Sequence, residues 1–179
     1  MVNLMIISVD DIMSMPDFIG QDTKILQKKL NALELLIRKY TNNNFQNRSI
    51  RFTGNSLGDR IFGGHPFIRM GDTIQISESE VNDGLYVVTE VGKDFIRLDK
   101  EVFTVDFNMV TKVVYPEDIQ VGIINLLKYE VDMRDKVGIK SESLSRHSVT
   151  YVDYDANNQV MGYPVSLLGF LKPYMKARF

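Results

Sequence analysis

The hydrophobic period of this chain changes twice, near residue 45 and again near residue 115. In residues 21–40 and 116–131, apolar side chains recur every three or four positions, as on the buried face of an amphipathic helix. In residues 46–115 they alternate with polar side chains in short runs that Gly, Asn and Asp separate, which is typical of strands and turns. The pattern predicts an α+β fold, a small helical bundle interrupted by an inserted β-rich module.

The two changes of period also predict the domain boundaries. Residues 1–45 and 116–179 would form the helical domain, and residues 46–115 would form a small β-barrel or sandwich inserted into it. An inserted module requires that its two ends lie close together in space.

Capping and breaking residues delimit the helices. Ser8 or Asp10 can cap a short first helix that Pro16 stops, and Asp22 or Thr23 stands at the start of the second. The face of the second helix consists of Leu26, Leu30, Leu33 and Ile37. The third helix begins at Pro116, whose ring suits a first turn, and Gly138 is expected to stop it.

Short alternating runs predict five or six strands in the inserted module. They are residues 50–53, 73–77, 85–88, 95–98, 102–105 and 110–115. Asn82-Asp83-Gly84 is predicted as a turn, because Gly adopts positive φ without steric cost, and residues 54–66 are predicted as a loop.

The part of the chain after the third helix is predicted as a polar turn, a strand and a final helix. Residues 137–144 form the turn, residues 148–152 the strand and residues 153–162 a loop. Tyr163-Pro164 would begin a helix with Val165, Leu168 and Leu171 on one face, and Pro173 would bend or end it.

The last six residues form a basic, apolar tail, Tyr174-Met175-Lys176-Ala177-Arg178-Phe179. Two interpretations stay open: a terminal segment that packs on its own domain, or a segment that docks into a partner. Aromatic residues, Met and Arg are enriched in the cores of protein interfaces, which favours the second interpretation for this tail.

Composition excludes several kinds of site. The chain of 179 residues has no cysteine, so it forms no disulfide, and His65 and His147 lie far apart in sequence without metal-ligand spacing. A net charge of −2 does not indicate a nucleic-acid binder. No apolar run approaches the roughly 20 residues of a membrane span, and residues 1–7 lack a basic region, so we expect synthesis in the cytoplasm.

Three motifs resemble chemical sites but lack essential parts. Residues 153–157 begin like a calcium loop, but Asn158 stands in place of its Gly and Pro164 in place of its Glu. Residues 63–66 lack the Lys of a phosphate-binding loop, and residues 145–148 place a hydroxyl near an imidazole without a recognisable acid or oxyanion hole. We therefore expect no enzymatic activity, no cofactor and no metal.

Three stretches carry a resemblance to a known family. They are Leu26 to Tyr40 with Thr41 and Phe45; Pro116 through Gly138-Ile139-Lys140-Ser141-Glu142-Ser143-Leu144-Ser145 to Ser148-Val149-Thr150-Tyr151; and Gly162-Tyr163-Pro164 with Leu167, Leu168, Leu171 and the tail to Arg178. In their order and spacing they resemble the head–tail connector proteins of tailed phages, also called head-completion or adaptor proteins. The resemblance covers a little over half of the chain.

The resemblance implies a structural virion protein at the head–tail junction. Such proteins form a ring, commonly twelvefold, under the portal, extend the DNA channel and offer a platform for the tail or the next neck protein. Genomic DNA would pass through the ring without sequence-specific contact, because strong phosphate pairing would hinder sliding. Family C-terminal segments commonly dock into the portal, and the matching residues here are Leu171, Tyr174, Met175, Lys176, Arg178 and Phe179.

The contact between copies of the chain is predicted in residues 141–151. The candidate residues are Ser141, Glu142, Leu144, Ser148 and Tyr151, and the alternative is an ordinary hairpin or loop within one chain. The inserted module departs from many family members, although Gly71–Ile74 and Asn82–Val88 look like small barrel modules that are common in phage structural proteins.

Two other interpretations stay open. The chain could be another neck or tail-completion protein of the same virion. It could also be a cytoplasmic adaptor whose barrel binds peptide or single-stranded nucleic acid, with aromatic side chains stacking beside arginines. The aromatic candidates are Phe52, Phe62, Phe67 and Tyr86, and the basic ones are Arg48, Arg51, Arg60 and Arg69.

Overall fold

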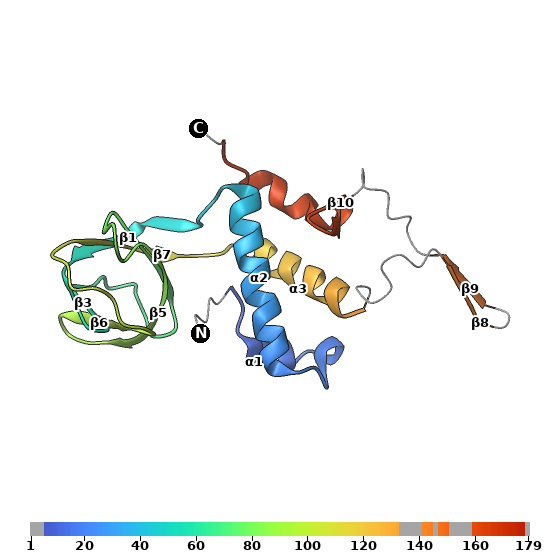
Figure 1. Cartoon of the computed structure of the whole chain (residues 1–179), viewed down its shortest axis with the longest axis horizontal. Helices are drawn as coiled ribbons and strands as arrows, with labels where there is room; N and C mark the ends of the chain where they lie inside the picture. Colours follow the sequence, from blue (N-terminus) through green and yellow to red (C-terminus); the bar gives the residue numbers. More distant parts are fainter. Residues whose placement is uncertain (1–5, 133–140, 145–146, 151–158, 178–179) are drawn as a thin grey trace.

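The computed structural model describes residues 6–132, 141–144, 147–150 and 159–177, with a curled sheet on one side and packed helices on the other (Figure 1). The described helices are α1 (Val9–Met13), η1 (Pro16–Phe18), α2 (Thr23–Thr41), α3 (Glu117–Asp132) and η4 (Val165–Tyr174), of which η1 and η4 are 3₁₀-helices.

One seven-stranded antiparallel sheet dominates the fold, in the order β1-β7-β4-β5-β6-β3-β2. Its strands are β1 (Gln46–Gly54), β2 (Ser56–Leu57), β3 (Arg60–Phe62), β4 (Thr73–Ser77), β5 (Gly84–Val91), β6 (Phe95–Leu98) and β7 (Asn108–Val113). The predicted fold class, a helical bundle interrupted by a barrel or sandwich, is therefore wrong. The sheet is not a closed barrel, because among the described residues no ladder joins the edge strands β1 and β2.

Residues 54–66 account for part of this error, because they were predicted as a loop. Strands β2 and β3 lie there and pair through Ser56 with Ile61 and Leu57 with Arg60. Gly58 takes the left-handed φ of 63° in the two-residue turn between them. β3 then pairs with β6 and so extends the sheet beyond that strand.

The predicted second helix is confirmed as α2. The Asp22 side chain caps it by accepting hydrogen bonds from the backbone N–H groups of Lys24 and Ile25, at 2.8 and 3.0 Å. Asn42, in the left-handed conformation with a φ of 51°, ends it. Ser8 caps α1, and α3 begins one residue after Pro116.

Several later elements differ from the prediction. Residues 102–105 are not a strand, whereas Ser141–Leu144, predicted as part of a turn, forms strand β8 and pairs with β9 (His147–Thr150). Tyr163–Pro164 is strand β11, paired with β10 (Gln159–Val160), and not the first helical turn. Helix η4 continues through Pro173 to Tyr174. Gly138 lies outside the described residues.

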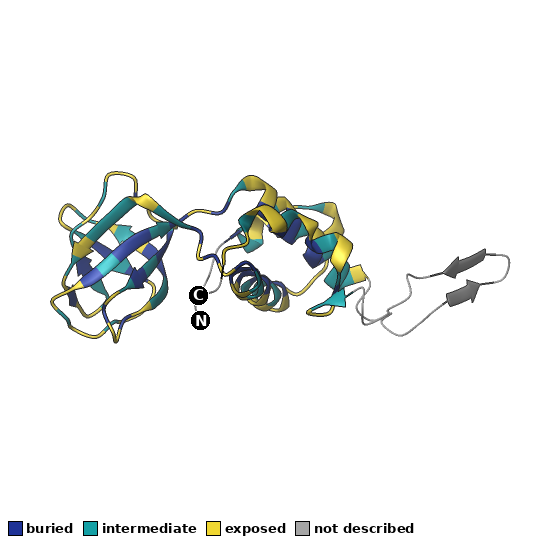
Figure 2. Cartoon of the chain, turned by 90° about the horizontal axis from the view of Figure 1, so that it is seen from above, coloured by how far each residue is buried: buried dark blue, intermediate teal, exposed yellow. Residues whose placement is uncertain are grey.

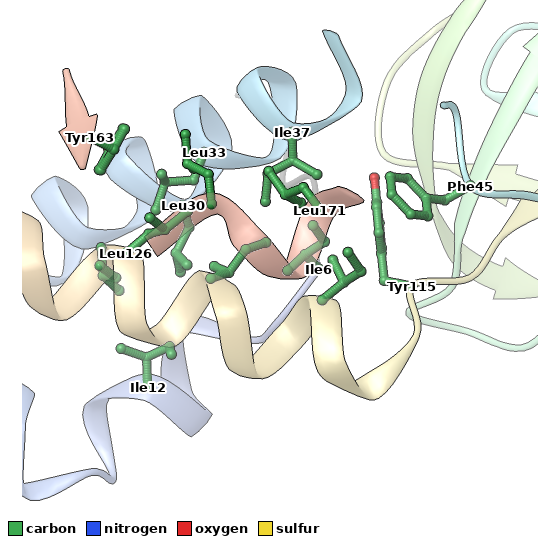
Figure 3. Packing of buried hydrophobic residues seen from close by; sticks show 14 of the residues in the cluster. Ile6, Ile12, Leu30, Leu33, Ile37, Phe45, Tyr115, Leu126, Tyr163 and Leu171 are labelled. Atoms are coloured by element: carbon green, nitrogen blue, oxygen red, sulfur yellow. The ribbon is translucent and has the colours of Figure 1, made fainter. Parts of the chain in front are cut away.

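The buried apolar side chains form two clusters, one in each body (Figure 2). The cluster of the helices contains Ile12, Phe18, Leu26, Leu33, Ile37, Ile119, Ile123, Leu126, Leu168 and Leu171, among others (Figure 3). The cluster of the sheet contains Ile61, Ile68, Ile74, Ile76, Tyr86, Val88, Ile96, Leu98 and Val110. The proposed domain boundaries at residues 45 and 116 stay a prediction.

Candidate interaction sites

The sheet meets the helices where Phe45 enters β1 and Tyr115 leaves β7. Their rings lie 4.9 Å apart between centroids, and the backbone N–H of Val114 donates to the carbonyl of Phe45 over 2.9 Å (Figure 3). The two ends of the inserted segment are thus side by side, as predicted. The chain passes between the helices and the sheet at Phe45 and again at Tyr115. Because these two residues contact each other, the contact fixes how the sheet is held on the helices.

A buried polar network reinforces this junction. The Tyr115 hydroxyl donates to Glu34 Oε1 over 2.7 Å and accepts from Arg38 Nη1 over 3.1 Å. Arg38 Nη2 also donates to Gln75 Oε1, 2.8 Å away on β4. Arg38 therefore links α2 to the sheet directly.

Burial controls the electrostatics of this network. It raises the pKa of Glu34 above its ordinary value, although the hydrogen bond from Tyr115 and the charge of Arg38 act in the opposite direction. Burial, with the Glu34 charge, also raises the pKa of the Tyr115 hydroxyl, which therefore remains a hydrogen-bond donor. Sequence reasoning missed this network. The spacing of Glu34 and Arg38, four residues apart on α2 beside the apolar face, was the available signal.

The C-terminal segment packs against the chain's own helices. The Tyr174 hydroxyl donates to the Asp118 carboxylate at the start of α3, 2.7 Å from each oxygen, and its ring lies 5.9 Å from that of Phe45. This hydrogen bond raises the pKa of Tyr174. Beyond it, the Lys176 backbone N–H donates to the Thr41 carbonyl over 2.8 Å.

Asparagines that end α2 hold the same segment. Asn43 Nδ2 donates to the Tyr174 carbonyl over 3.2 Å, and Asn42 Nδ2 donates to the Ala177 carbonyl over 2.8 Å. The side chains predicted for docking therefore divide into three groups. Leu171 is fully buried in the helical core, Tyr174 is half-buried, and Met175 and Lys176 are exposed. Arg178 and Phe179 lie outside the described residues.

Phe170 makes a contact on η4 that sequence reasoning also missed. A Cβ built on Gly122 of α3 would lie 2.3 Å from the Phe170 ring. Only a glycine therefore lets the ring lie directly against the backbone of α3.

Four of the residues predicted for contacts between copies lie on the β8–β9 hairpin. The pairs in its register are Ser141 with Thr150, Glu142 with Val149, Ser143 with Ser148, and Leu144 with His147. Tyr151, the fifth candidate, lies outside the described residues. Among the described residues, β8 and β9 pair with each other and with no third strand.

The structure adds no catalytic or binding group to the motifs that resemble chemical sites, within the residues that it describes. Residues 63–66 line an open hollow of about 560 Å³, but the Gly63 N–H already donates to the Asp94 carbonyl over 2.8 Å. Residues 145–146 and 153–157 lie outside the described residues. Within the described ranges, no three His, Cys, Asp or Glu side chains lie together so that they could hold a metal ion.

The four aromatic side chains considered for nucleic-acid stacking differ in burial. Tyr86 is buried and its hydroxyl donates to the Asn82 carbonyl over 2.8 Å. Phe52 packs on the sheet cluster and Phe62 is half-buried, whereas Phe67 is 62% exposed. Of these four rings, only that of Phe67 is largely exposed for stacking on a base.

Comparison with known proteins gives no relative: no protein-family model matches the chain, and no curated protein matches it. Among the helices that the structure describes, none has the length and apolar character needed to cross a membrane.

Proposed function

We propose that this chain is a structural virion protein, a head–tail connector or adaptor without enzymatic activity. In this proposal, copies of the chain form a ring on the portal, twelvefold as is common among the proteins it resembles, and extend the DNA channel towards the tail. Its partners are the portal protein, its own copies, the tail or the next neck protein, and the genomic DNA that passes through.

The observation that carries the proposal is the β8–β9 hairpin. A two-stranded hairpin is marginally stable in water without a third strand or a packed face. Among the described residues this hairpin pairs with no third strand, and a sheet edge without a neighbouring strand is a template for pairing with another chain. In a ring, the adjacent copy would cover the hairpin, and each copy would supply the same contact once.

The end of the chain supports a second contact, with the portal. Tyr174 is anchored on Asp118 and the backbone of Lys176 on Thr41, so the Met175 and Lys176 side chains are held at the surface by a fixed backbone. Met175 is 52% exposed. A small contact of this kind becomes strong when many copies bind together, because binding of each further copy is then intramolecular. We therefore expect the isolated protein to be a monomer that forms its ring on the portal.

Native mass spectrometry of the full chain mixed with purified portal rings tests the proposal. The wild-type protein should add the mass of a full ring. A variant carrying Met175→Ser and Lys176→Glu keeps the backbone hydrogen bond to Thr41, so it should fold normally but add no ring. Lys93→Glu, an equal change of charge at an exposed site on the sheet, is the matched control and should bind like wild type.

The outcomes separate the two parts of the proposal. If the double variant still adds a ring, the connector function stands and the docking site lies elsewhere. If wild-type protein adds no mass, the connector function fails, and a neck protein further from the portal becomes the better interpretation. A stable ring in the absence of portal, seen by light scattering at micromolar protein, would contradict assembly on the portal.

A further inference from the structure

Four large apolar side chains are exposed in three segments at one end of the sheet. Leu57 is 59% exposed, Val81 55%, Phe103 69% and Phe107 45%. Here these four residues are called the distal patch. Large exposed apolar side chains gathered in one place mark interaction sites more often than isolated ones do.

One buried side chain holds these three segments together. Asn82 Nδ2 donates to the Phe103 carbonyl over 2.8 Å and to Asn108 Oδ1 over 3.1 Å, while Asn82 Oδ1 accepts from the Phe103 N–H over 2.8 Å. Asn82 is 1% exposed. The backbone that carries Phe103 is therefore fixed on both its donor and its acceptor.

Ser56 completes this support beside Leu57. Its hydroxyl donates to the Phe103 carbonyl over 2.6 Å and accepts from the Val105 N–H over 3.1 Å. Its own N–H donates to the Val105 carbonyl over 2.9 Å. The segment after residue 102 is not a strand, but these hydrogen bonds hold its backbone in place, so little backbone entropy is lost when a partner binds.

The strand registers place the patch at the end of the sheet away from the helices. β1 and β7 pair from Gln46 with Val113, next to the helices, to Gly54 with Asn108 at the opposite end. Ser77, the last residue of β4, pairs with Met109 near that opposite end. The distal patch therefore faces away from the helical contacts described above.

The turn that carries Val81 adopts a conformation that is costly for its residues. Glu78 and Glu80 have φ values of 61° and 65°, in the left-handed region that non-glycine residues rarely adopt. The Asp83 carboxylate accepts from the Ser79 N–H over 2.9 Å and the Ser79 hydroxyl accepts from the Asn82 N–H over 2.8 Å, which keeps the turn closed.

The charges around the patch are mainly negative. Glu78, Glu80, Asp83, Glu101 and Asp106 are all exposed and belong to the same three segments or adjoin them. The nearby bases are already engaged: the Lys100 ammonium lies 4.2 Å from the centre of the Tyr86 ring, and the Arg60 guanidinium lies 4.9 Å from that of Phe95. These carboxylates would repel the phosphates of a nucleic acid. They would also repel the same carboxylates on a second copy of the chain.

We propose that the distal patch is a docking site for a second protein that presents an apolar anchor flanked by Lys or Arg side chains. Phe103 and Phe107 would supply the buried centre of the interface, and the carboxylates would pair with the partner's cations at the rim. This inference does not depend on the connector function, since it uses neither the hairpin nor the end of the chain.

Selection from a displayed library of random peptides, with the immobilised full-length chain as target, tests the proposal. Selected peptides should carry an aromatic or aliphatic residue flanked by Lys or Arg. Their affinity, measured by fluorescence anisotropy, should fall at least about tenfold for Phe103→Ser and Phe107→Ser. Phe67→Ser removes an equally exposed phenylalanine from another loop and should leave the affinity unchanged.

A charge variant supplies a second measurement that does not touch the apolar side chains. Glu101→Lys with Asp106→Lys should weaken the same peptides at least about fivefold at low salt and less at high salt. Thermal melts of all variants check that they are folded. The proposal is overturned if the peptides lack basic residues, or bind the Phe103 and Phe107 variants as tightly as wild type. It is also overturned if the patch instead binds an oligothymidine, or mediates dimerisation that Phe103→Ser abolishes in sedimentation velocity.

Discussion

The Tyr115 hydroxyl lies 2.7 Å from the buried Glu34 carboxylate, and so joins the residue that follows the sheet to the middle of α2. Glu34 is 1% exposed, which makes this donor important, because a buried carboxylate that loses its hydrogen bond has no water to replace it.

Tyr115→Phe should therefore destabilise the protein by about 1–3 kcal/mol, the usual cost of leaving a buried polar group without its partner. The change keeps the ring that packs on Phe45, so the loss is that of the hydroxyl. Urea unfolding followed by circular dichroism measures it. Tyr40→Phe removes a hydroxyl from the same helical body without touching Glu34 and should change the unfolding free energy by less than about 0.5 kcal/mol.

Glu34 also predicts a pH dependence of stability. Its pKa is raised above the ordinary value of 4.5 in the folded protein, chiefly by burial, so the folded state binds its proton more tightly than the unfolded state does. The free energy of unfolding should therefore fall as pH rises from about 4.5, the unfolded value, through the raised folded pKa.

Glu34→Gln isolates this contribution, because its side-chain oxygen still accepts from Tyr115 but does not ionise. The difference in unfolding free energy between wild type and this variant should change with pH in that window, with the variant gaining relative stability as pH rises. Thermal melts at closely spaced pH values test this, and parallel curves for the two proteins would show that Glu34 is not responsible.

Gly122 and Phe170 predict a coupled effect. Alanine usually favours a helix over glycine by about 1 kcal/mol, yet its Cβ here would lie 2.3 Å from the Phe170 ring. Gly122→Ala should therefore destabilise the protein by about 1–3 kcal/mol, as overpacking does. In the Phe170→Ala background the same change should become neutral or stabilising. A double-mutant cycle by urea unfolding measures the coupling, and a stabilising single change would mean that the ring does not rest there.

The Asn82 hydrogen bonds predict that the stability of the distal end of the sheet depends on the Asn82 side-chain amide. Asn82→Ala leaves the Phe103 N–H and Asn108 Oδ1 without their partner, which should cost about 2–3 kcal/mol. Asn55→Ala is the matched control, because that side chain is exposed and the Asn55 carbonyl still accepts from Phe62. Equal losses in the two variants would contradict the role given to Asn82.

Local signals in the sequence were sufficient for the long helices. The spacing of Leu26, Leu30, Leu33 and Ile37 and the capping residue Asp22 are contained within α2 itself, and the structure has both. Helix η4 shows the limit of such signals. Val165, Leu168, Leu171 and Tyr174 stand three residues apart, a spacing that fits a 3₁₀-helix as well as an α-helix, so the pattern could not distinguish them.

Features that depend on distant residues could not be read in this way. Asn82 was predicted as a turn residue, but its partners Ser56, Phe103 and Asn108 are identified only by the folded sheet. Likewise, β2 and β3 have only two and three residues, too few to show an alternation, and β3 becomes a strand because β6 offers an edge to Arg60, Ile61 and Phe62. The fold class was wrong for this reason: the sheet extends through strands that have almost no signal of their own.

The hairpin gives the last prediction, on assembly. If β8 and β9 are covered by an adjacent copy in the proposed ring, Leu144→Ser and Tyr151→Ser should remove apolar contacts between copies while each chain stays folded. Native mass spectrometry with portal rings should then show partial or absent rings, and far-ultraviolet circular dichroism should match wild type. Ile25→Ser, at a 55% exposed site on α2, should leave ring formation unchanged. Unfolding of the isolated Leu144 or Tyr151 variant would instead place these side chains in the chain's own core, and the contact between copies would have to lie elsewhere.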